Sequence, residues 1–201
     1  AVLAEAGPDA PVLAVNVLNG FAPAQIALTA NSNIWQGGAS DEYHCLAEKL
    51  WDWCSGKGFR IDILVNNAGI GGAEAFLSSA PAYSDVRIML NIRALVLLTR
   101  LFLPELRNHP GARILNIGSI SAYYALPYKA VYAATKAFVK SFSRALNEEL
   151  KDTPVRITVV NPNGVFTNAG TFQRIDTHSK LAKRFFIMQA DKVARIAVDK
   201  M

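Results

Sequence analysis

Short apolar segments alternate with helical patterns along most of this chain. The segments are continuously apolar and lack the polar–apolar alternation of a half-buried strand. Such runs are typical of strands buried on both faces, in parallel sheets that helices cover on either side. We therefore expect an α/β fold with a doubly wound, Rossmann-like parallel sheet. The expected strands are 12–16, 26–29, 61–66, 112–119 and 156–161, and the expected helices are 40–55, 82–109, 130–152 and 190–201.

Length and composition favour a single reduced domain. With 201 residues, 51% of them hydrophobic, the chain can bury one good core, so we expect residues 1–201 to form one dinucleotide-binding domain. No apolar run approaches the roughly 20 residues that span a bilayer, and no secretory signal is found. Cys45 and Cys54 fall on opposite faces of one expected helix and cannot pair there. These features predict a cytoplasmic protein without a membrane span.

Charge and histidine content exclude two kinds of site. The formal charge of +5 is modest and scattered, and no run of basic and aromatic residues marks a nucleic-acid groove. We therefore expect no nucleic-acid partner. His44, His109 and His178 are isolated and lack the spacing of metal ligands, so no metal site is predicted.

A tyrosine and a lysine lie four residues apart in the expected helix 130–152. Tyr132 and Lys136 therefore share one helix face, one turn apart. A free phenol has a pKa of about 10, and an ammonium within about 4–6 Å brings that pKa toward neutrality. Ser119, at the end of an expected strand, would steady a reacting oxygen beside the pair. The pair alone is a weak signal, since a helix with an exposed lysine and a half-buried tyrosine has the same spacing.

An asparagine-rich turn directly follows the expected strand 61–66. Together with an asparagine in the helical stretch 82–109 and the Ser, Tyr and Lys above, this turn resembles the short-chain dehydrogenase/reductase family. The set, in chain order, is Asn66-Asn67-Ala68-Gly69, Asn91, Ser119, Tyr132 and Lys136. The resemblance covers residues 26–199, with the motifs in the family's order and spacing.

The resemblance implies an oxidoreductase that transfers a hydride between a nicotinamide cofactor and a ketone, an aldehyde or a secondary alcohol. Tyr132 would be the general acid for reduction or the base for oxidation. Lys136 would lower the pKa of Tyr132 and bind the nicotinamide ribose, while Ser119 would hold the substrate oxygen. Asn91 would position a water that links Lys136 to solvent. Taken alone, Asn91 equally fits an asparagine that kinks or caps a helix.

Two turns are expected to contact the cofactor. The resemblance implies that a dinucleotide would approach the main chain after strand 61–66, which would require small residues there. Such a turn is also ordinary after a strand. The segment 162–167 resembles the family's Pro-Gly segment, with Asn163 in place of the usual glycine. The expected cofactor contacts are Asn67, Ala68, Gly69, Tyr132, Lys136, Pro162, Val165 and Thr167. The resemblance also implies a substrate lid at 168–186, and Tyr123, Tyr124 and Tyr128 beside the substrate pocket.

The family's glycine-rich pyrophosphate turn is not found. Residues 1–7 resemble the end of the helix after that turn, and an alternative alignment on Gly20 offers one glycine where three are expected. Only about nine residues separate strands 12–16 and 26–29, too few for the crossover helix of a parallel pair. We therefore expect a sheet without its first and last strands. Strand 12–16 should be detached from its usual neighbour or lie next to strand 61–66.

Cofactor type and assembly follow from weaker signals. Asn16 ends the strand where an acid would select NAD, and no carboxylate there repels a 2′-phosphate, so we favour NADP(H) over NAD(H). In the family, the helices at 82–109 and 130–152 build interfaces, so a homodimer or homotetramer is expected. A second class of function stays open: a truncated, non-catalytic remnant that cannot bind the dinucleotide and serves at most as an oligomerising or interaction module.

Overall fold

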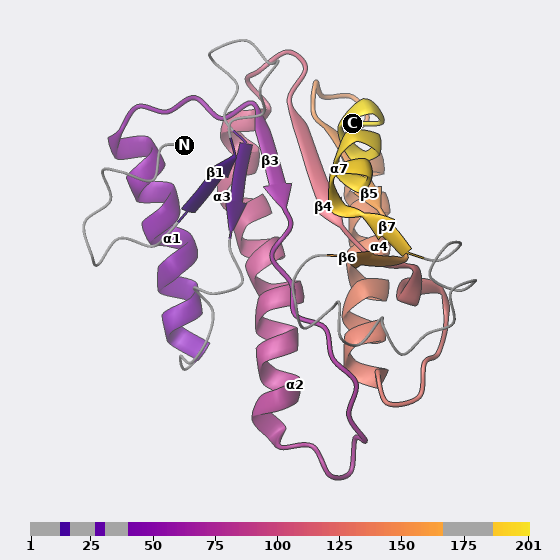
Figure 1. Cartoon of the computed structure of the whole chain (residues 1–201). Coiled ribbons are helices and arrows are strands. Elements are labelled where there is room, and N and C mark those ends of the chain that lie inside the picture. Colours follow the sequence, from indigo (N-terminus) through magenta and orange to yellow (C-terminus); the bar gives the residue numbers. More distant parts are fainter. Residues whose placement is uncertain (1–12, 17–26, 31–39, 167–186) are drawn as a thin grey trace.

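A five-stranded sheet forms the centre of the molecule (Figure 1). The computed structural model describes residues 13–16, 27–30, 40–166 and 187–201. The strand order is β1-β2-β3-β4-β5, and β6 and β7 form a separate parallel pair. The strands are β1 (Leu13–Asn16), β2 (Ala27–Ala30), β3 (Ile63–Asn66), β4 (Arg113–Ile117), β5 (Arg156–Val160), β6 (Gly164–Phe166) and β7 (Ile187–Gln189).

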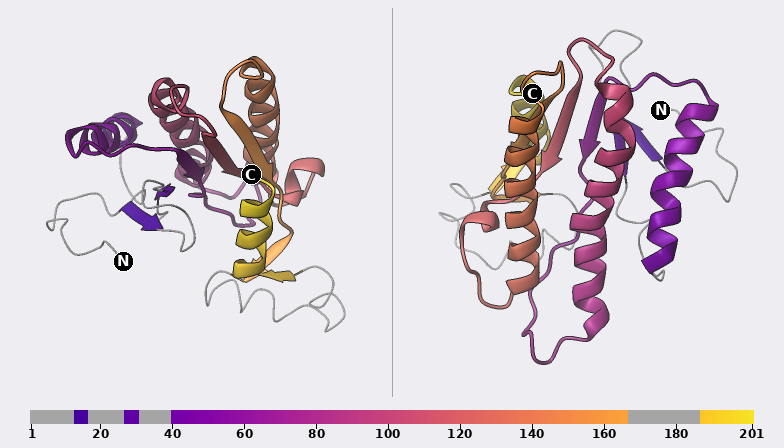
Figure 2. Two further views of the ribbon diagram at one scale, coloured as in Figure 1. Left: turned by 90° about the horizontal axis from the view of Figure 1, so that it is seen from above. Right: turned by 180° about the vertical axis from the view of Figure 1, so that it is seen from behind.

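Helices cover the sheet from both sides, so the expected α/β architecture is confirmed (Figure 2). Helices α1, α3 and α4 lie on one face and α7 lies on the other. None of the described helices is long and apolar enough to cross a bilayer. The helices are α1 (Ser40–Gly56), α2 (Pro81–Ile88), the π-helical η2 (Met89–Ala94), α3 (Leu95–Leu106), the 3₁₀ turn η3 (Ile120–Tyr123), α4 (Ala130–Glu149) and α7 (Ala190–Asp199).

The edge of the sheet at β1 corrects the expected arrangement. Strands β2 to β5 are parallel, as expected, but β1 pairs with β2 in the antiparallel direction, with Leu13 opposite Ala30. Of the two arrangements expected for this strand, the one that places it next to strand 61–66 is wrong, because β2 occupies that position beside β3. The physical reason is the short connection. It cannot hold a crossover helix, but it is long enough to reverse the chain into an antiparallel neighbour.

The long helical stretch at 82–109 is continuous but not uniform. It begins at Pro81, where the missing amide hydrogen costs nothing in the first turn, and it ends at Leu106, three residues before the expected end. Between α2 and α3 the π-helical η2 contains Asn91. Single π turns within α-helices are frequent at functional sites.

Apolar side chains fill the space between the sheet and the helices α1, α3 and α4. Phe102 is fully buried, and its ring meets Trp51 edge-on with centroids 5.0 Å apart. Cys54 also lies in this cluster, where burial raises the pKa of its thiol to about 12 and keeps it protonated. The core thus anchors the strands whose carboxyl ends carry the asparagine-rich turn and Ser119.

A chain of buried polar side chains joins β3 and β4 to the helices behind them. Asn66 donates to Thr99 Oγ1 at 3.2 Å and to Asn116 Oδ1 at 2.8 Å. Asn116 donates to Ser143 Oγ at 2.8 Å, and Ser143 donates to the Val139 carbonyl at 2.6 Å. Each strand end is therefore tied to a helix, which fixes where the following loops begin.

Candidate functional site

The expected catalytic residues and the asparagine-rich turn come from four elements: β3, η2, β4 and α4. β3 and β4 are parallel neighbours, so the loop after Asn66 and the turn after Ile117 leave the sheet at the same edge. Helix α4 packs behind them and presents Tyr132 and Lys136 from its first turns. The topology therefore brings together residues that are up to about seventy positions apart in the sequence.

Lys136 is buried beside both strand ends. Its Nζ donates to the Ile117 carbonyl at 2.7 Å, and a side chain at Gly69 would place its Cβ 3.2 Å from this Nζ. Burial lowers the pKa of Lys136 to about 8, because a low-dielectric environment disfavours the ammonium. An ammonium carries three hydrogens, so two remain for other partners. A side chain at position 69 would therefore crowd both Lys136 and Asn91, whose Oδ1 is equally close to such a Cβ.

Asn91 binds the loop that follows the asparagine-rich turn. Its Oδ1 accepts from the Ile70 amide at 2.8 Å, and its Nδ2 donates to the Ile70 carbonyl at 3.1 Å and to Thr135 Oγ1 at 3.0 Å. The side chain is 1% exposed. Both amide hydrogens are used, and one lone pair of Oδ1 stays free to accept from a water. Asn91 therefore links the loop to helix α4 as well as to its own helix.

Ser119 begins the 3₁₀ turn η3 and is paired with a second serine. Its Oγ accepts from the Ser121 amide at 3.2 Å and from Ser121 Oγ at 2.6 Å. Both side chains are buried. A hydroxyl has two acceptor positions and one donor hydrogen, so this arrangement leaves the Ser119 hydrogen available to donate to an incoming oxygen. Ser121 was not among the expected site residues.

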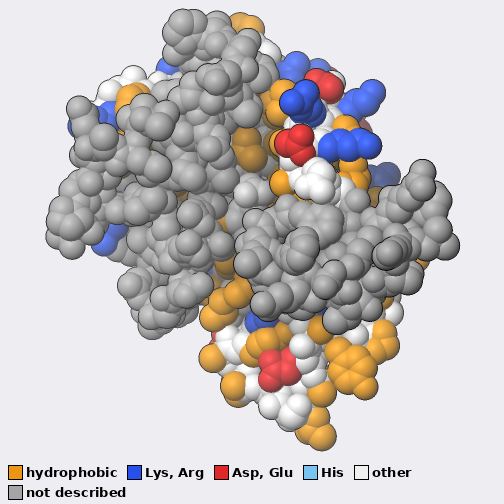
Figure 3. All heavy atoms as spheres, viewed as in Figure 1, with side chains coloured by type: hydrophobic (Ala, Val, Ile, Leu, Met, Phe, Trp, Pro, Cys, Tyr) orange, Lys and Arg blue, Asp and Glu red, His pale blue; other side chains and the backbone are white. Residues whose placement is uncertain are grey.

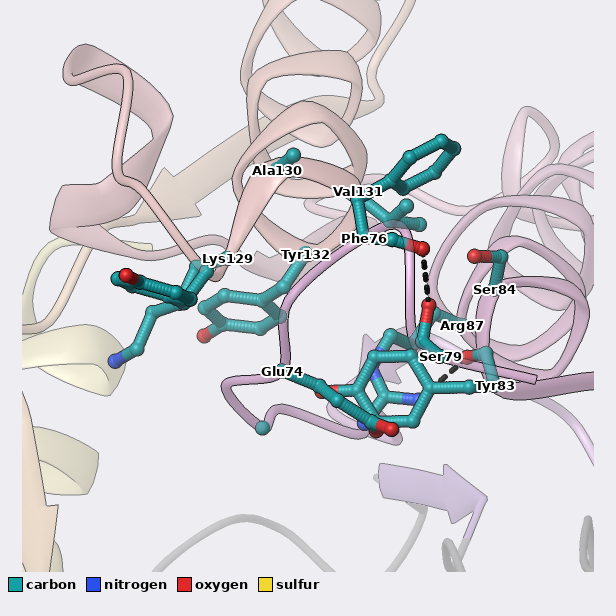
Figure 4. A pocket seen from close by; sticks show the side chains of 12 residues that line it. Glu74, Phe76, Ser79, Tyr83, Ser84, Arg87, Lys129, Ala130, Val131 and Tyr132 are labelled. Carbon is teal, nitrogen blue, oxygen red and sulfur yellow. Dashed lines mark hydrogen bonds between the residues drawn. The ribbon is translucent and has the colours of Figure 1, made fainter. Parts of the chain in front are cut away.

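Tyr132 lies against the glycine-rich part of the loop after β3. A Cβ at Gly71 would be 3.8 Å from Tyr132 Cε2, within van der Waals contact of the ring. Figure 4 shows a small pocket beside it, in which the Tyr132 hydroxyl points away from Tyr83 and Arg87. Tyr132 as a whole is half-buried.

Short contacts connect the whole expected catalytic set. A Cβ on Gly71 would meet the Tyr132 ring, and the preceding Ile70 is hydrogen-bonded to Asn91. Gly69 lies beside Lys136, which donates to the Ile117 carbonyl two residues before Ser119. The structure therefore brings Asn91, Ser119, Tyr132 and Lys136 into one region.

The expected cofactor contacts surround the same region, with one outside the described residues. Asn67 and Gly69 are exposed, whereas Ala68, Pro162 and Val165 are half-buried. The Pro162 carbonyl accepts from the Ile120 amide at 2.9 Å, which joins the segment after β5 to the turn at Ser119. Thr167 and the lid expected at 168–186 lie outside the described residues.

Asn161 and Asn163 take roles that the sequence did not indicate. Asn161 Oδ1 accepts from the Ser119 amide at 3.3 Å and fills the space beside Gly118, where a Cβ would clash with it. Asn163 Oδ1 accepts from the Gly164 amide at 2.9 Å and closes the turn in which glycine was expected. Side-chain amides thus stabilise both turns that flank Ser119.

Exposed apolar and aromatic side chains gather near the pocket. The space-filling view shows them at the lower end of the molecule, over the loops that precede α2 and α4 (Figure 3). Leu77 is 99% exposed and Phe76 is 71% exposed. Tyr123, Tyr124 and Tyr128 are exposed as well, and Tyr128 lines the pocket together with Tyr132. Within the described part of the chain, no three acidic, Cys or His side chains cluster as metal ligands would.

Arg87 is the largest omission from the expected site. It is 5% exposed, lies one helical turn before Asn91, and donates from Nη2 to the Gly71 carbonyl at 2.6 Å. The available signal was its position: an arginine four residues before Asn91 falls on the helix face that meets the loop. Sequence alone gave no reason to place that charge inside the protein.

Sequence comparison relates the chain to known dehydrogenases. A family model described as short chain dehydrogenase matches residues 30–177. The chain is 40% identical over 118 residues to the NADP-dependent 3-hydroxy acid dehydrogenase YdfG of Escherichia coli K12, covering 58% of this chain and 46% of that protein. It is 35% identical over 147 residues to human 17-beta-hydroxysteroid dehydrogenase type 3, covering 72% and 46%. The chain thus spans less than half of the length of these curated relatives.

A solved structure shares both the fold and part of the sequence. L-sorbose reductase from Gluconobacter frateurii, complexed with NADPH and L-sorbose, superposes with a TM-score of 0.59 at 29% identity. The superposition covers 71% of this chain and 52% of that one.

Proposed function

Because the chain belongs to the short-chain dehydrogenase family, we propose that it is an NAD(P)-dependent oxidoreductase acting on a small carbonyl compound or secondary alcohol. The observation that carries the proposal is the meeting of Lys136, Ser119 and the loop beside Tyr132 at one edge of the sheet. A nicotinamide cofactor supplies the hydride when it is bound. We favour NADP(H), in keeping with the NADPH named for L-sorbose reductase and the NADP dependence named for YdfG.

The described residues fit such a cofactor at the carboxyl edge of β3. Asn67 and Gly69 are exposed there, and the absence of a side chain at Gly69 leaves main chain open next to Lys136. The two remaining hydrogens of the Lys136 ammonium would bind ribose hydroxyls. Ala68, Pro162, Val165 and Thr167 would complete the contacts on either side.

In the reducing direction, Tyr132 would donate its phenolic proton to the carbonyl oxygen while the hydride reaches the carbonyl carbon. Ser119 would donate its free hydrogen to the same oxygen, because Ser121 occupies its two acceptor positions. Lys136 would hold the site electropositive. Asn91 would bind a water through its free lone pair, and this water would link Lys136 to solvent, so that a proton from solvent could replace the one that Tyr132 donates. In the oxidising direction the same groups would act in reverse, with Tyr132 as the base.

The test is Tyr132→Phe, assayed by NADPH consumption with a panel of aliphatic ketones, aldehydes and 3-oxo esters. Loss of the proton donor should lower turnover by about 10²–10⁴-fold at saturating NADPH while the melting temperature stays at the wild-type value. Tyr43→Phe, which removes the same atom from helix α1, is the matched control and should keep the wild-type rate. Retained turnover in Tyr132→Phe would disprove the proton-transfer role. Wild-type protein that neither binds NADPH nor consumes it would favour the non-catalytic alternative.

A further inference from the structure

We propose that Arg87 is a positioning residue, which fixes residues 70–72 of the loop after β3 and thereby the surface against which the Tyr132 ring lies. Its effect on turnover rests on the proposed function, whereas its effect on the loop does not.

The Arg87 guanidinium is buried without a carboxylate partner in the described part of the chain. Its Nη2 donates to the Gly71 carbonyl at 2.6 Å and its Nη1 to the Tyr83 carbonyl at 2.5 Å. The guanidinium carbon lies 3.2 Å from the centre of the Tyr83 ring, and Nε has no hydrogen-bond partner among the described residues. Carbonyl dipoles and a ring face therefore compensate the charge. A buried charge held this way stabilises a fold less than an apolar side chain of similar size would, which points to another role.

The loop is shaped to receive this guanidinium. Gly72 has φ of +132°, a conformation that residues with a side chain rarely adopt. A Cβ there would lie 2.5 Å from Arg87 Nη2 and 2.6 Å from the Tyr83 hydroxyl. The main chain can therefore reach Arg87 only because position 72 is glycine.

Arg87 and Asn91 bind consecutive residues of the loop from one helix face. They are four residues apart, and Asn91 holds Ile70 while Arg87 holds Gly71. Gly71 also faces the Tyr132 ring, since a Cβ built on Gly71 would lie 3.8 Å from Tyr132 Cε2. Figure 4 shows Tyr132 in the same pocket as Arg87. The loop thus lies between α2–η2 and the first turn of α4, and a shift of the Gly71 carbonyl changes the position of the surface beside Tyr132.

A second hydrogen bond holds the loop after β3, and its amide can be followed by hydrogen exchange. The Glu74 amide donates to the Tyr128 carbonyl at 2.7 Å, and Tyr128 itself has φ of +64°. This link holds the loop to the segment before α4 without involving Arg87. Hydrogen exchange at Ile70 and Glu74 therefore reports on whether the loop stays in place when Arg87 is altered.

The experiment compares Arg87→Met, Arg87→Lys and the control Arg100→Met, an exposed arginine on α3. Methionine keeps the length and apolar packing of the side chain but removes the two nitrogens that donate to the Tyr83 and Gly71 carbonyls. Lysine keeps the charge but lacks the planar guanidinium that reaches both carbonyls. We expect both Arg87 variants to exchange the Ile70 and Glu74 amides at least about tenfold faster, with β3 and β4 unchanged. Because misplaced catalytic groups lower rates steeply, kcat for the carbonyl that the wild type reduces fastest should fall about tenfold or more. Arg87→Met should keep or raise the melting temperature.

Two results would overturn the proposal. One is wild-type exchange at Ile70 and Glu74 in Arg87→Met. The other is a lowered melting temperature with an unchanged kcat of the folded fraction, which would make Arg87 a structural residue only. Failure of the proposed function gives a different pattern: the wild type would then neither bind nor consume NADPH, while the exchange result at the loop stands on its own.

Discussion

Lys136 is a buried amine, and its burial lowers the pKa of the ammonium. Its 5% exposure and its hydrogen bond to the Ile117 carbonyl follow from α4 packing directly on the end of β4. The sequence indicated which residue would carry the charge, because its spacing from Tyr132 fits one helix face. It did not indicate burial, since a lysine near a helix N-terminus is usually exposed. Burial brings the pKa of its ammonium to about 8, into the range where proton transfer near neutrality is efficient.

The same pKa predicts how stability depends on pH. The folded protein binds the Lys136 proton less tightly than the unfolded chain, whose value is 10.5. From about pH 8 to 10.5 the unfolded state holds more protons, so the free energy of unfolding rises with pH across this window. At about 1.4 kcal/mol per pKa unit the total is roughly 3 kcal/mol. Lys136→Met lacks this contribution. The difference in the free energy of unfolding between wild type and variant, measured in urea, should therefore grow by roughly 3 kcal/mol in favour of the wild type from about pH 8 to 10.5. A difference independent of pH would contradict the burial of a protonated amine.

At the scale of elements, buried polar side chains fix the two strands that deliver the site. Asn66 and Asn116 lie side by side on β3 and β4, and each reaches a helix. The sequence placed Asn66 at the end of the expected strand 61–66 and at the start of the asparagine-rich motif, and the structure adds its partners across the sheet. Periodicity cannot reveal this, because an asparagine in a strand carries no sign of which partner it meets across the sheet.

We expect Asn116→Ala to destabilise the protein without touching the proposed chemistry. The substitution leaves a donor of Asn66 unpaired in a buried site and opens a cavity, which together should lower the free energy of unfolding by about 2–4 kcal/mol. Asn108→Ala, at an exposed asparagine after α3, should change it by less than about 0.5 kcal/mol. Urea unfolding measures both. Equal stability of the two variants would show that the network between β3 and β4 contributes little.

At the scale of the whole molecule, the sheet edge at the carboxyl ends of β3 and β4 is where a dinucleotide should bind. Binding to the folded state alone raises the free energy of unfolding by about 2.7 kcal/mol at a concentration one hundred times the Kd. For a chain of this size that corresponds to a rise of roughly 5–10 °C in melting temperature.

NADPH should produce this shift at lower concentration than NADH if the cofactor preference proposed above is right. Asn16 does not bear on this preference, because the antiparallel direction of β1 places it opposite Ala27 at the start of β2, away from this edge. A thermal scan of the chain with each cofactor measures the difference, and adenosine alone serves as the control for weak, non-specific protection. Stronger protection by NADH would reverse the cofactor preference. No protection by either would remove the basis of the proposed function.

The sequence by itself determined the architecture and most of the candidate site. Continuous apolar runs between amphipathic helices fix strands β3 to β5 and helix α4 to within a few residues, because burial on both faces leaves little choice of residue. The spacing of Tyr132 and Lys136 fixes their common face, because helix geometry depends only on the backbone.

Only the tertiary structure decided what depends on neighbours distant in the sequence. The antiparallel pairing of β1, the pairing of Ser121 with Ser119 and the burial of Arg87 against Gly71 all arise where separate segments meet. A local pattern specifies an element and the face it presents. The partner of that face, and therefore the cost or benefit of placing a charge there, is set only when the elements pack.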